Sequence, residues 1–379
     1  MKFLYSHRTR AADGQQVHIR ALTDALAASG HDVVMAGPDG ANEKPLDAKD
    51  ERGLKALLPG PLYECAEYGY SFPAFLRLMK TAKASRPDIL YERYNLFFHA
   101  GVWAKRRLGL PMILEVNAPL AEERAAHGHL ALKNFARKSE AAIWRAADMA
   151  LPVSGVLAAR LAAAGVPEPR IDVIHNGVEE AFLKPAAGAL VRARYGLEEQ
   201  TVLGFAGFVR DWHGLDRAVR FLVETGREDV ALLIVGDGPA RPDLERLASE
   251  LGVSARVHFA GVVQREEMPA HLAAFDIALQ PAVTDYASPL KLFEYMAQGR
   301  AVLAPDQANI REVLTHGEDA LLFPEGGFET ALAALAQSGA LRQRLGAAAR
   351  ETLIRRDFTW AGNARRVEAI AERLKGTRA

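Results

Sequence analysis

Lys291 and Glu294 lie one helical turn apart in a stretch, residues 289–298, whose apolar residues have helical spacing. The stretch follows an apolar run, 276–281, which predicts a buried strand closed by a proline. A strand, a polar loop and a helix N-terminus in this order offer backbone N–H groups and the positive end of the helix dipole to an anion. Lys291 adds a full charge in the first turn, and Glu294 can accept two hydroxyl hydrogen bonds. This pattern suits the diphosphate and ribose of a nucleotide. The alternative is an ordinary strand, loop and helix with a solvated lysine and glutamate.

The composition predicts a globular protein of two domains. A chain of 379 residues is too long for one ordinary core. Its 47 Lys and Arg residues balance its 47 Asp and Glu residues, which gives no support for a nucleic-acid partner. The single cysteine, Cys65, cannot form an internal disulfide and suits a reducing cytoplasm. No run approaches the roughly 20 apolar residues of a membrane span, and the N-terminus turns polar too soon for a signal peptide.

The first half of the chain opens with a β-α-β pattern. A strand at 2–6 is followed by a polar loop containing Gly14, a helix at about 16–29 and a strand at 31–37, which implies a parallel sheet. The loop lacks the Gly-x-Gly-x-x-Gly fingerprint of nicotinamide dinucleotide binding. The half continues with a polar loop at 38–60, helices at about 72–85, 97–108 and 130–147, and strands at 88–92, 111–116, 149–154 and 171–174.

Polar residues follow two of these strands. Arg93 comes directly after the strand at 88–92, and Asn117 directly after the strand at 111–116. Because ligands bind at the carboxyl ends of strands in open α/β sheets, both are candidates for a binding cleft. The segment after Asn117 supplies four more candidates: Glu122, Glu123, Arg124 and His127.

The predicted helix 130–147 carries basic residues beside apolar ones. A solvated helix face explains this pattern, and so does a contact with a membrane surface. The basic residues are Lys133, Arg137, Lys138 and Arg145.

The strand and helix pattern restarts near residue 200. The second half has predicted strands at 201–207, 231–235 and 257–261, which precede the strand and helix at 276–298 described above. It also has predicted helices at 215–225 and 241–251 and a terminal amphipathic helix at 361–374. The chain therefore predicts two doubly wound α/β halves. A polar linker ending near residue 196 joins them, and the cleft between them is the predicted working site.

Seven segments, taken in order, resemble the motifs of retaining family 4 glycosyltransferases. They are Gly30–Val33, His175–Val178, Gly207–Gly214, Val235–Pro239, Phe259–Gly261, Asp276 and Ser288–Gly299. The resemblance covers most of the chain. It implies the GT-B architecture, in which two Rossmann-like parallel-sheet domains face each other across a cleft. It also implies that residues 1–180, joined by the C-terminal helix 359–379, bind the acceptor and that residues 181–358 bind a nucleotide sugar.

The resemblance gives roles to residues at matching positions. Glu294 would hold the ribose hydroxyls, while Arg210 and His213 would lie on the diphosphate, whose growing negative charge must be stabilised. Lys291 and the N–H groups near Ser288 would supply the second side of this clamp. An arginine binds bidentately and permanently, whereas His213 contributes only if protonated or as a neutral donor. The remaining donor-side candidates are Gly14, Gly207, Gly236, Gly238, Val263, Pro289 and Leu290.

The chain departs from the family pattern at two positions. The first glutamate of the Glu-x7-Glu motif would lie eight residues before Glu294, where this chain has Tyr286. Asp285, Tyr286 or backbone N–H groups are the candidates for gripping the sugar. Asn117 stands where the family often has a histidine, and His127 either compensates for it or is a surface residue. The catalytic candidates are Arg210, Lys291, Glu294 and Asn117, and the acceptor-side candidates are Arg93 and His127.

The expected reaction moves a sugar from a UDP- or GDP-sugar to an acceptor hydroxyl with retention of configuration. The family's usual mechanism needs no general base from the protein, because the departing phosphate oxygen takes the acceptor's proton. We expect no cofactor and no metal, with the nucleotide sugar as co-substrate. The expected acceptor is a sugar, a lipid-linked glycan or a small molecule in polysaccharide or glycoconjugate biosynthesis. The expected location is the cytoplasm, with or without peripheral contact at the inner face of the membrane.

Two other functions fit the same architecture. A nucleotide-sugar epimerase or hydrolase would need a carboxylate acid or base in the cleft, for which Glu115, Glu122 and Glu123 are candidates. A non-catalytic nucleotide-sugar-binding subunit would account for Tyr286 and His213 at their positions. The sequence makes no prediction of the oligomeric state.

Overall fold

The computed structural model describes residues 1–9, 14–38 and 58–376. Most of the polar loop predicted at 38–60 lies outside the described residues. The chain divides into two compact units. The first unit consists of residues 1–175, the short segment 286–288 and the C-terminal residues from Trp360 onward. The second consists of residues 176–285 and 289–359.

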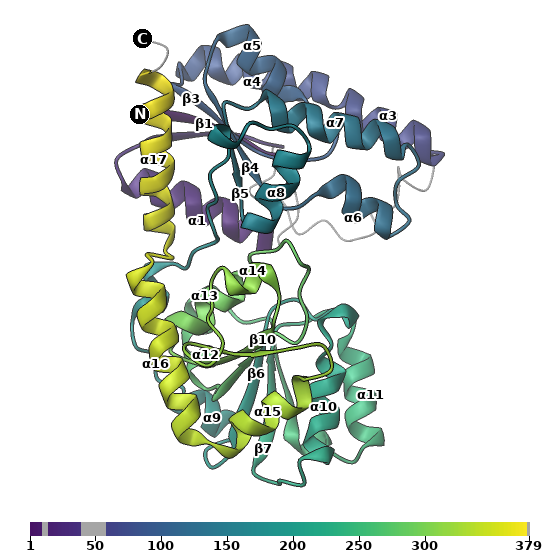
Figure 1. The fold of residues 1–379 in the computed structure, drawn as a ribbon, viewed down its shortest axis with the longest axis vertical. Helices are drawn as coiled ribbons and strands as arrows, with labels where there is room; N and C mark the ends of the chain where they lie inside the picture. Colours follow the sequence, from purple (N-terminus) through teal and green to yellow (C-terminus); the bar gives the residue numbers. More distant parts are fainter. Residues whose placement is uncertain (10–13, 39–57, 377–379) are drawn as a thin grey trace. The chain divides into compact units, whose positions relative to one another are not determined.

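A five-stranded parallel sheet forms the centre of the first unit, with the order β2-β1-β3-β4-β5 (Figure 1). The strands are β1 (Lys2–Ser6), β2 (Asp32–Ala36), β3 (Ile89–Arg93), β4 (Met112–Val116) and β5 (Met149–Pro152). Every residue of β3 and β4 is buried, as expected of parallel strands that are covered on both faces.

Helices cover this sheet. They are α1 (Gly14–Ala28), α3 (Gly60–Gly69), α4 (Ser71–Ser85), α5 (Ala100–Leu108), α6 (Leu120–Ala126), α7 (Lys133–Ala146) and α8 (Gly155–Ala163). The C-terminal helix α17 (Trp360–Gly376) packs along α1, at the opposite end of the sequence (Figure 1). The helix predicted at 361–374 is therefore present, and its amphipathic character follows from burying one face on α1.

The strand predicted at 171–174 does not form. Ile171 makes only an isolated bridge to Ala150 of β5. The Ile174 N–H donates to the carbonyl of Pro152, which ends β5. Because proline has no N–H to donate in return, the ladder stops there.

A six-stranded parallel sheet forms the centre of the second unit, with the order β11-β10-β9-β6-β7-β8. Its strands are β6 (Thr201–Ala206), β7 (Val230–Val235), β8 (Val257–Gly261), β9 (Ile277–Leu279), β10 (Ala301–Pro305) and β11 (Leu321–Phe323). Its helices are α9 (Ala189–Tyr195), α10 (Leu215–Glu224), α11 (Arg241–Glu250), α12 (Met268–Ala273), α13 (Leu290–Ala297), α14 (Ala308–Arg311), α15 (Phe328–Gln337) and α16 (Gly339–Arg355). Two parallel, Rossmann-like sheets are thus the fold that the sequence predicted.

The chain passes between the units at residues 175–176, 285–286, 288–289 and 359–360. The first and last of these passages are joined inside the second unit. Val178 forms a parallel bridge with Thr359, and its N–H donates to the Phe358 carbonyl at 3.1 Å.

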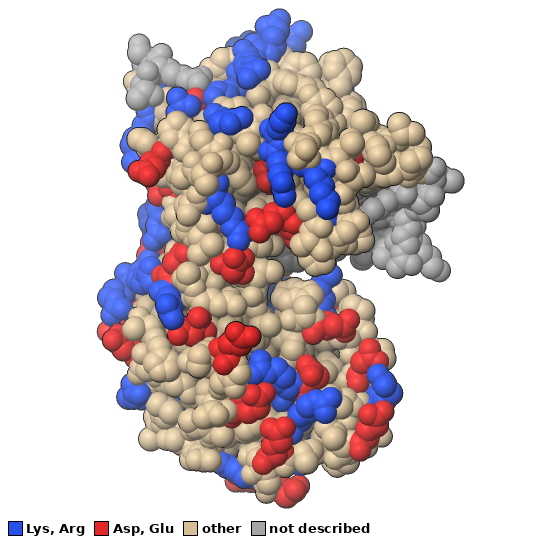
Figure 2. All heavy atoms as spheres, turned by 45° about the vertical axis from the view of Figure 1, so that its right-hand side comes forward, with Lys and Arg blue, Asp and Glu red and all other residues tan. Residues whose placement is uncertain are grey.

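Acidic and basic side chains both appear on the face shown in Figure 2, and neither sign forms one continuous field there. This distribution agrees with the equal counts of the two signs in the sequence. Among the described residues, no helix is long and apolar enough to cross a membrane.

Candidate active site

One buried hydroxyl fixes α13 to the end of β6. The Ala206 N–H donates to the Tyr295 hydroxyl oxygen at 2.9 Å. Leu292, Phe293 and Tyr295 are completely buried, so the apolar residues of α13 anchor it in the core. The sequence predicted this helix from its spacing, and the structure confirms it at Leu290–Ala297. Lys291 and Glu294 therefore stand on a rigid element.

Lys291 points along the helix start toward the end of β6. Its ammonium nitrogen, Nζ, lies 3.7 Å from the centre of the Phe205 ring. A Cβ added to Gly207 would lie 3.1 Å from the same nitrogen, so the ammonium sits against the backbone that follows β6. Burial lowers the pKa of Lys291 to about 7, because a charged ammonium loses hydration there. Attraction to Glu294 acts in the opposite direction.

Three glycines allow the loops after β6 and β7 to touch. Gly207 has φ 132° and Gly236 has φ 130°, values that favour glycine. A Cβ on Gly236 would lie 2.0 Å from the Gly207 carbonyl oxygen. A Cβ on Gly238 would lie 2.2 Å from the Val209 carbonyl oxygen. Gly236 and Gly238 are thus required for loop packing, whatever their role toward a ligand.

His213 is buried, and burial lowers its pKa to about 3, with further lowering from the charges of Lys291 and Arg210. Its Nδ1 accepts a hydrogen bond from the Arg210 backbone N–H at 3.2 Å. The neutral ring therefore carries its proton on Nε2. Of the two roles that the sequence left open for His213, a neutral donor is the one that the structure permits.

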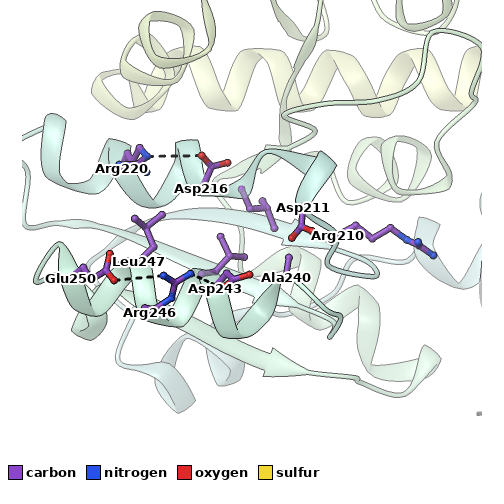
Figure 3. Close-up of a pocket in the computed structure, with 11 residues that line it drawn as sticks. Arg210, Asp211, Asp216, Arg220, Ala240, Asp243, Arg246, Leu247 and Glu250 are labelled. Atoms are coloured by element: carbon purple, nitrogen blue, oxygen red, sulfur yellow. Dashed lines mark hydrogen bonds and ion pairs between the residues drawn. The ribbon is translucent and has the colours of Figure 1, made fainter. Parts of the chain in front are cut away.

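The Arg210 side chain is exposed and lies over the Phe208 ring, 4.8 Å from its centre. Figure 3 shows it extending away from a hollow of about 330 Å³ between α10 and α11. Several charged side chains of that hollow pair with one another, as Arg246 does with Asp243 at 2.6 Å. The hollow is not lined by Lys291, His213 or Glu294.

Glu294 is 7% exposed, and its carboxylate is held by a neighbouring arginine. Arg265 donates from Nη1 to Glu294 Oε1 at 2.6 Å. The same guanidinium also binds the carboxylate of Glu179 through Nε, at 3.0 Å, and through Nη2. Burial raises the pKa of Glu294, and Arg265 counteracts this rise.

The segment before α13 is shared between the units. Asp285 groups with the second unit, whereas residues 286–288 group with the first. The Ser154 hydroxyl donates to the Tyr286 carbonyl at 2.7 Å, and Arg160 lies 5.4 Å from the centre of the Tyr286 ring. Ser288 is buried, Pro289 is the N-cap residue of α13 and Leu290 is its first residue. Which of Asp285, Tyr286 and the backbone N–H groups would bind the sugar stays a prediction.

In the first unit, Glu115 gathers four polar side chains at the carboxyl end of the sheet. His18 Nε2 lies 3.1 Å from Glu115 Oε2, and the Tyr91 hydroxyl donates to the same oxygen at 2.9 Å. Asn117 donates to Oε1 at 2.6 Å, and Arg93 forms an ion pair with that oxygen. The structure thus brings Arg93 and Asn117 together on one carboxylate, and their predicted place in a binding cleft stays a prediction.

This network makes Glu115 a poor general acid or base. Burial alone would raise the pKa of Glu115, but the charges of His18 and Arg93 and the hydrogen bonds hold it well below its usual range. Its carboxylate already accepts from four donors. Glu122 pairs with Arg160 at 3.1 Å on the surface. The carboxylate that an epimerase or hydrolase would need is therefore not favoured by these residues.

Three further predicted residues have simple positions. His127 is exposed, and its Nδ1 is bonded to the Glu123 carbonyl at 2.8 Å, as in a surface histidine. Val263 is half-buried and packs against the core of the second unit. Gly14 begins α1 instead of lying in the loop before it. Their roles toward a ligand stay predictions.

Sequence patterns did not reveal the partners of these residues. Glu179 and Arg265 are 86 residues apart, and Arg265 and Glu294 are 29 apart. The one usable signal for Glu115 was its place two residues before Asn117. For Glu179 it was its place directly after the His175–Val178 motif.

Two family models match the chain. The model for Glycosyltransferase Family 4 matches residues 12–182, and the model for Glycosyl transferases group 1 matches residues 200–338. The chain belongs to the family 4 glycosyltransferases. This glycosyltransferase therefore carries a family match on both of its sheets.

Curated relatives extend along most of the glycosyltransferase. The D-inositol 3-phosphate glycosyltransferase of Nocardioides sp. is 28% identical, over 97% of this chain and 86% of its own length. The GDP-mannose-dependent alpha-mannosyltransferase of Mycolicibacterium smegmatis is 26% identical, over 89% of this chain and 88% of its own length. These relatives are glycosyltransferases, and the chain is a transferase of the same class.

Solved structures share the GT-B fold. Anabaena HepE in complex with UDP has a TM-score of 0.75 and 16% identity, covering 98% of this chain and 100% of its own. Sucrose-phosphate synthase from Thermosynechococcus elongatus has a TM-score of 0.76 and 19% identity, with full coverage of both chains. Identities this low show the fold alone.

Proposed function

We propose that this glycosyltransferase moves a sugar from a UDP- or GDP-sugar to an acceptor hydroxyl with retention of configuration. The observation that carries the proposal is the arrangement at the carboxyl end of β6. There Lys291 and His213 flank the backbone after Phe205, and Glu294 follows one turn along α13. Lys291 and His213 would donate hydrogen bonds to a diphosphate, and the Glu294 carboxylate would accept them from a diol, which is the combination that a nucleotide needs.

The proposed chemistry stabilises the leaving diphosphate. As the bond from the sugar to the phosphate breaks, negative charge grows on the phosphate oxygen. The Lys291 ammonium, the Arg210 guanidinium and the His213 Nε2–H supply positive charge and hydrogen bonds there. Glu294 accepts the ribose hydroxyls. The departing phosphate oxygen takes the proton of the acceptor hydroxyl on the same face of the sugar, so configuration is retained.

The residues of the first unit would hold the sugar and the acceptor. Asn117 can donate a hydrogen bond but cannot take a proton, and Arg93 remains charged. Both are oriented by the Glu115 carboxylate. Neither provides a general base, which agrees with proton transfer to the leaving phosphate.

The two candidate donors come from proteins similar to this one. The relatives include GDP-mannose-dependent mannosyltransferases, and HepE was solved with UDP. We extend the proposal to polysaccharide or glycoconjugate biosynthesis in the cytoplasm. The exposed basic residues of α7, Lys133, Arg137, Lys138 and Arg145, allow a lipid-linked acceptor and peripheral membrane contact.

The test has two stages. Thermal unfolding with UDP, GDP, ADP and CDP identifies the base, because a ligand that binds only the folded state raises the midpoint. Turnover of the matching nucleotide sugars is then measured with and without candidate acceptors. Release of nucleoside diphosphate that requires an acceptor supports transfer, and NMR of the first-formed product assigns the anomeric configuration.

The two rival functions give different results in the same assay. Equal release without an acceptor would indicate a hydrolase. Binding without any turnover would indicate a nucleotide-sugar-binding subunit. An Arg210→Ala or Glu294→Ala variant with full activity would contradict the assignment of the site.

A further inference from the structure

Arg265 connects the carboxylate of Glu294 to a second carboxylate, that of Glu179, and no motif of the sequence assigns it a role. We infer that Arg265 is a positioning residue for nucleotide binding, which keeps the Glu294 carboxylate aimed at the ribose. This inference rests on the proposed function, in which Glu294 accepts the ribose hydroxyls.

The guanidinium of Arg265 is fixed on three sides. Its Nη1 donates to Glu294 Oε1 at 2.6 Å, and its Nε donates to Glu179 Oε1 at 3.0 Å. Its Nη2 pairs with the second oxygen of Glu179. The guanidinium carbon, Cζ, lies over the Phe182 ring, 4.3 Å from the ring centre. A bidentate pair on one edge and an aromatic ring on one face leave the guanidinium little freedom to turn away from Glu294.

The anchor of this arrangement is itself rigid. Phe182 is 1% exposed and belongs to the core of the second unit. Its carbonyl accepts a hydrogen bond at 2.5 Å from Gln298, which follows the end of α13. The short helical turn that contains Phe182, residues 180–183, is thereby tied to the helix that carries Glu294.

Glu294 needs such a partner because it is buried. A carboxylate at this depth loses hydration, so burial favours the protonated acid, and the positive charge of Arg265 opposes this. An ionised carboxylate can accept hydrogen bonds from two adjacent hydroxyls. A carboxylic acid carries a proton on one oxygen and accepts less well. Arg265 thus keeps the form that recognises a diol.

One oxygen of the carboxylate is left for the ligand. Among the described residues, the hydrogen bond that the Glu294 carboxylate accepts comes from Arg265 and ends on Oε1. Oε2 remains to accept ribose hydroxyls. If the ion pair between Arg265 and Glu294 only stabilised the fold, replacing Arg265 would not change the preference for a ribonucleotide over its 2′-deoxy counterpart. This difference makes the inference testable.

The experiment compares ribonucleotides with their 2′-deoxy counterparts. Isothermal titration calorimetry of the full chain measures the dissociation constants of UDP, GDP, 2′-deoxy-UDP and 2′-deoxy-GDP. For the base that binds, we expect the wild type to prefer the ribonucleotide by about 10- to 100-fold, because a hydrogen bond to a charged group is lost with the hydroxyl. In Arg265→Met, which keeps the packing stem over Phe182, we expect this preference to approach one. The deoxynucleotide affinity should change little.

A matched control is available in the same unit. Arg217 also binds one carboxylate, that of Glu329, through two nitrogens and lies over an aromatic ring, that of Phe328. Arg217→Met should retain the full preference for the ribonucleotide. Arg265→Lys keeps the charge and should restore part of the preference. The loss of this preference in Arg265→Met should also be larger at pH 6 than at pH 8, because the Glu294 carboxyl without its arginine is more protonated at pH 6.

The outcomes separate this inference from the proposed function. If the wild type binds neither nucleoside diphosphate, or binds it without preferring the ribose form, the proposed role of Glu294 fails and the inference fails with it. If the wild type has the preference and Arg265→Met keeps it, only the inference is overturned. Should Arg265→Met not fold, Glu179→Gln provides the same test. It loosens one edge of the guanidinium, and an unchanged preference in that variant would overturn the inference.

Discussion

The Lys291 ammonium lies 3.7 Å from the centre of the Phe205 ring, and this contact joins the start of α13 to the end of β6. The ring faces a charge that burial disfavours, since the pKa of Lys291 is lowered to about 7. A cation–π contact recovers only part of the lost hydration. The protein therefore holds a lysine that gains its charge most readily when an anion arrives.

Nucleotide affinity should depend on pH through Lys291. Below about pH 7 the ammonium is charged before binding, whereas above it a proton must be taken up with the diphosphate. The dissociation constant should therefore rise by up to about tenfold per pH unit above pH 7, until the pKa of the bound state is reached. Calorimetry at pH 6, 7, 8 and 9 in buffers of different ionisation enthalpy measures both affinity and proton uptake. Lys291→Arg stays charged, so its nucleotide affinity should not depend on pH in this range. An unchanged pH dependence in that variant would show that another group causes it.

Replacing Lys291 by methionine should stabilise the empty protein. The free energy of unfolding at pH 6 to 7 should increase by about 1–3 kcal/mol, because a buried charge is replaced by an apolar side chain of similar length. Nucleotide-dependent stabilisation should be lost in the same variant. Urea unfolding with and without the nucleotide measures both quantities. A Lys291→Met protein that is less stable at pH 6 and still binds nucleotide would contradict the prediction.

Gly238→Ala should destabilise the second unit. The added Cβ would lie 2.2 Å from the Val209 carbonyl oxygen and 2.7 Å from its nitrogen, and backbone atoms cannot move aside cheaply. We expect a loss of about 1–3 kcal/mol, as for overpacked sites. Gly69→Ala is the control, since a Cβ there would have no atom within 4 Å. Thermal unfolding of the two variants should separate them clearly, and equal midpoints would show that the loops after β6 and β7 yield easily.

Glu92 should make the stability of the first unit depend on pH. Its side chain is completely buried, and burial raises its pKa to about 8, although the Ser6 hydroxyl donates to it at 2.8 Å. The folded state thus holds a proton that the unfolded chain releases near pH 4.5. This contribution to stability is present below pH 4.5 and is lost as the pH rises to 8, at up to about 1.4 kcal/mol per pH unit.

The isosteric variant Glu92→Gln isolates this effect. The amide cannot ionise, so the slope should vanish, and the variant should be more stable than the wild type at pH 8. Urea unfolding at pH 5, 6.5 and 8 gives the slope for both proteins. A wild type whose slope between pH 5 and 8 equals that of Glu92→Gln would show that Glu92 ionises freely in the folded state.

Nucleotide-sugar turnover should persist after removal of divalent ions. The proposed charge stabilisation comes from Arg210, Lys291 and the start of α13, and no step is assigned to a metal. Activity after treatment with EDTA should stay within about twofold of the untreated protein, a difference of less than 0.5 kcal/mol in the barrier. Recovery of a lost activity by Mg²⁺ or Mn²⁺ would show that an ion shares the diphosphate charge.

Local patterns in the sequence were sufficient for the elements that carry the site. Apolar spacing and glycine positions predicted α13, the strand ends at Arg93 and Asn117, and the restart of the fold near residue 200. These features depend on residues a few positions apart, where helix and strand periods fix which side chains share a face. The same reasoning failed at 171–174, because the partner edge ends in Pro152.

Residue spacing is therefore enough to place Lys291 and Glu294 on one helix behind a buried strand. The ionisation and the partners of these two residues depend on the folded structure. Glu294 is paired with Arg265 and Glu179, and Lys291 is buried against Phe205, because parallel strands bring distant segments to one edge of the sheet. Charge and burial depend on those distant neighbours, and residue spacing along the chain does not record them.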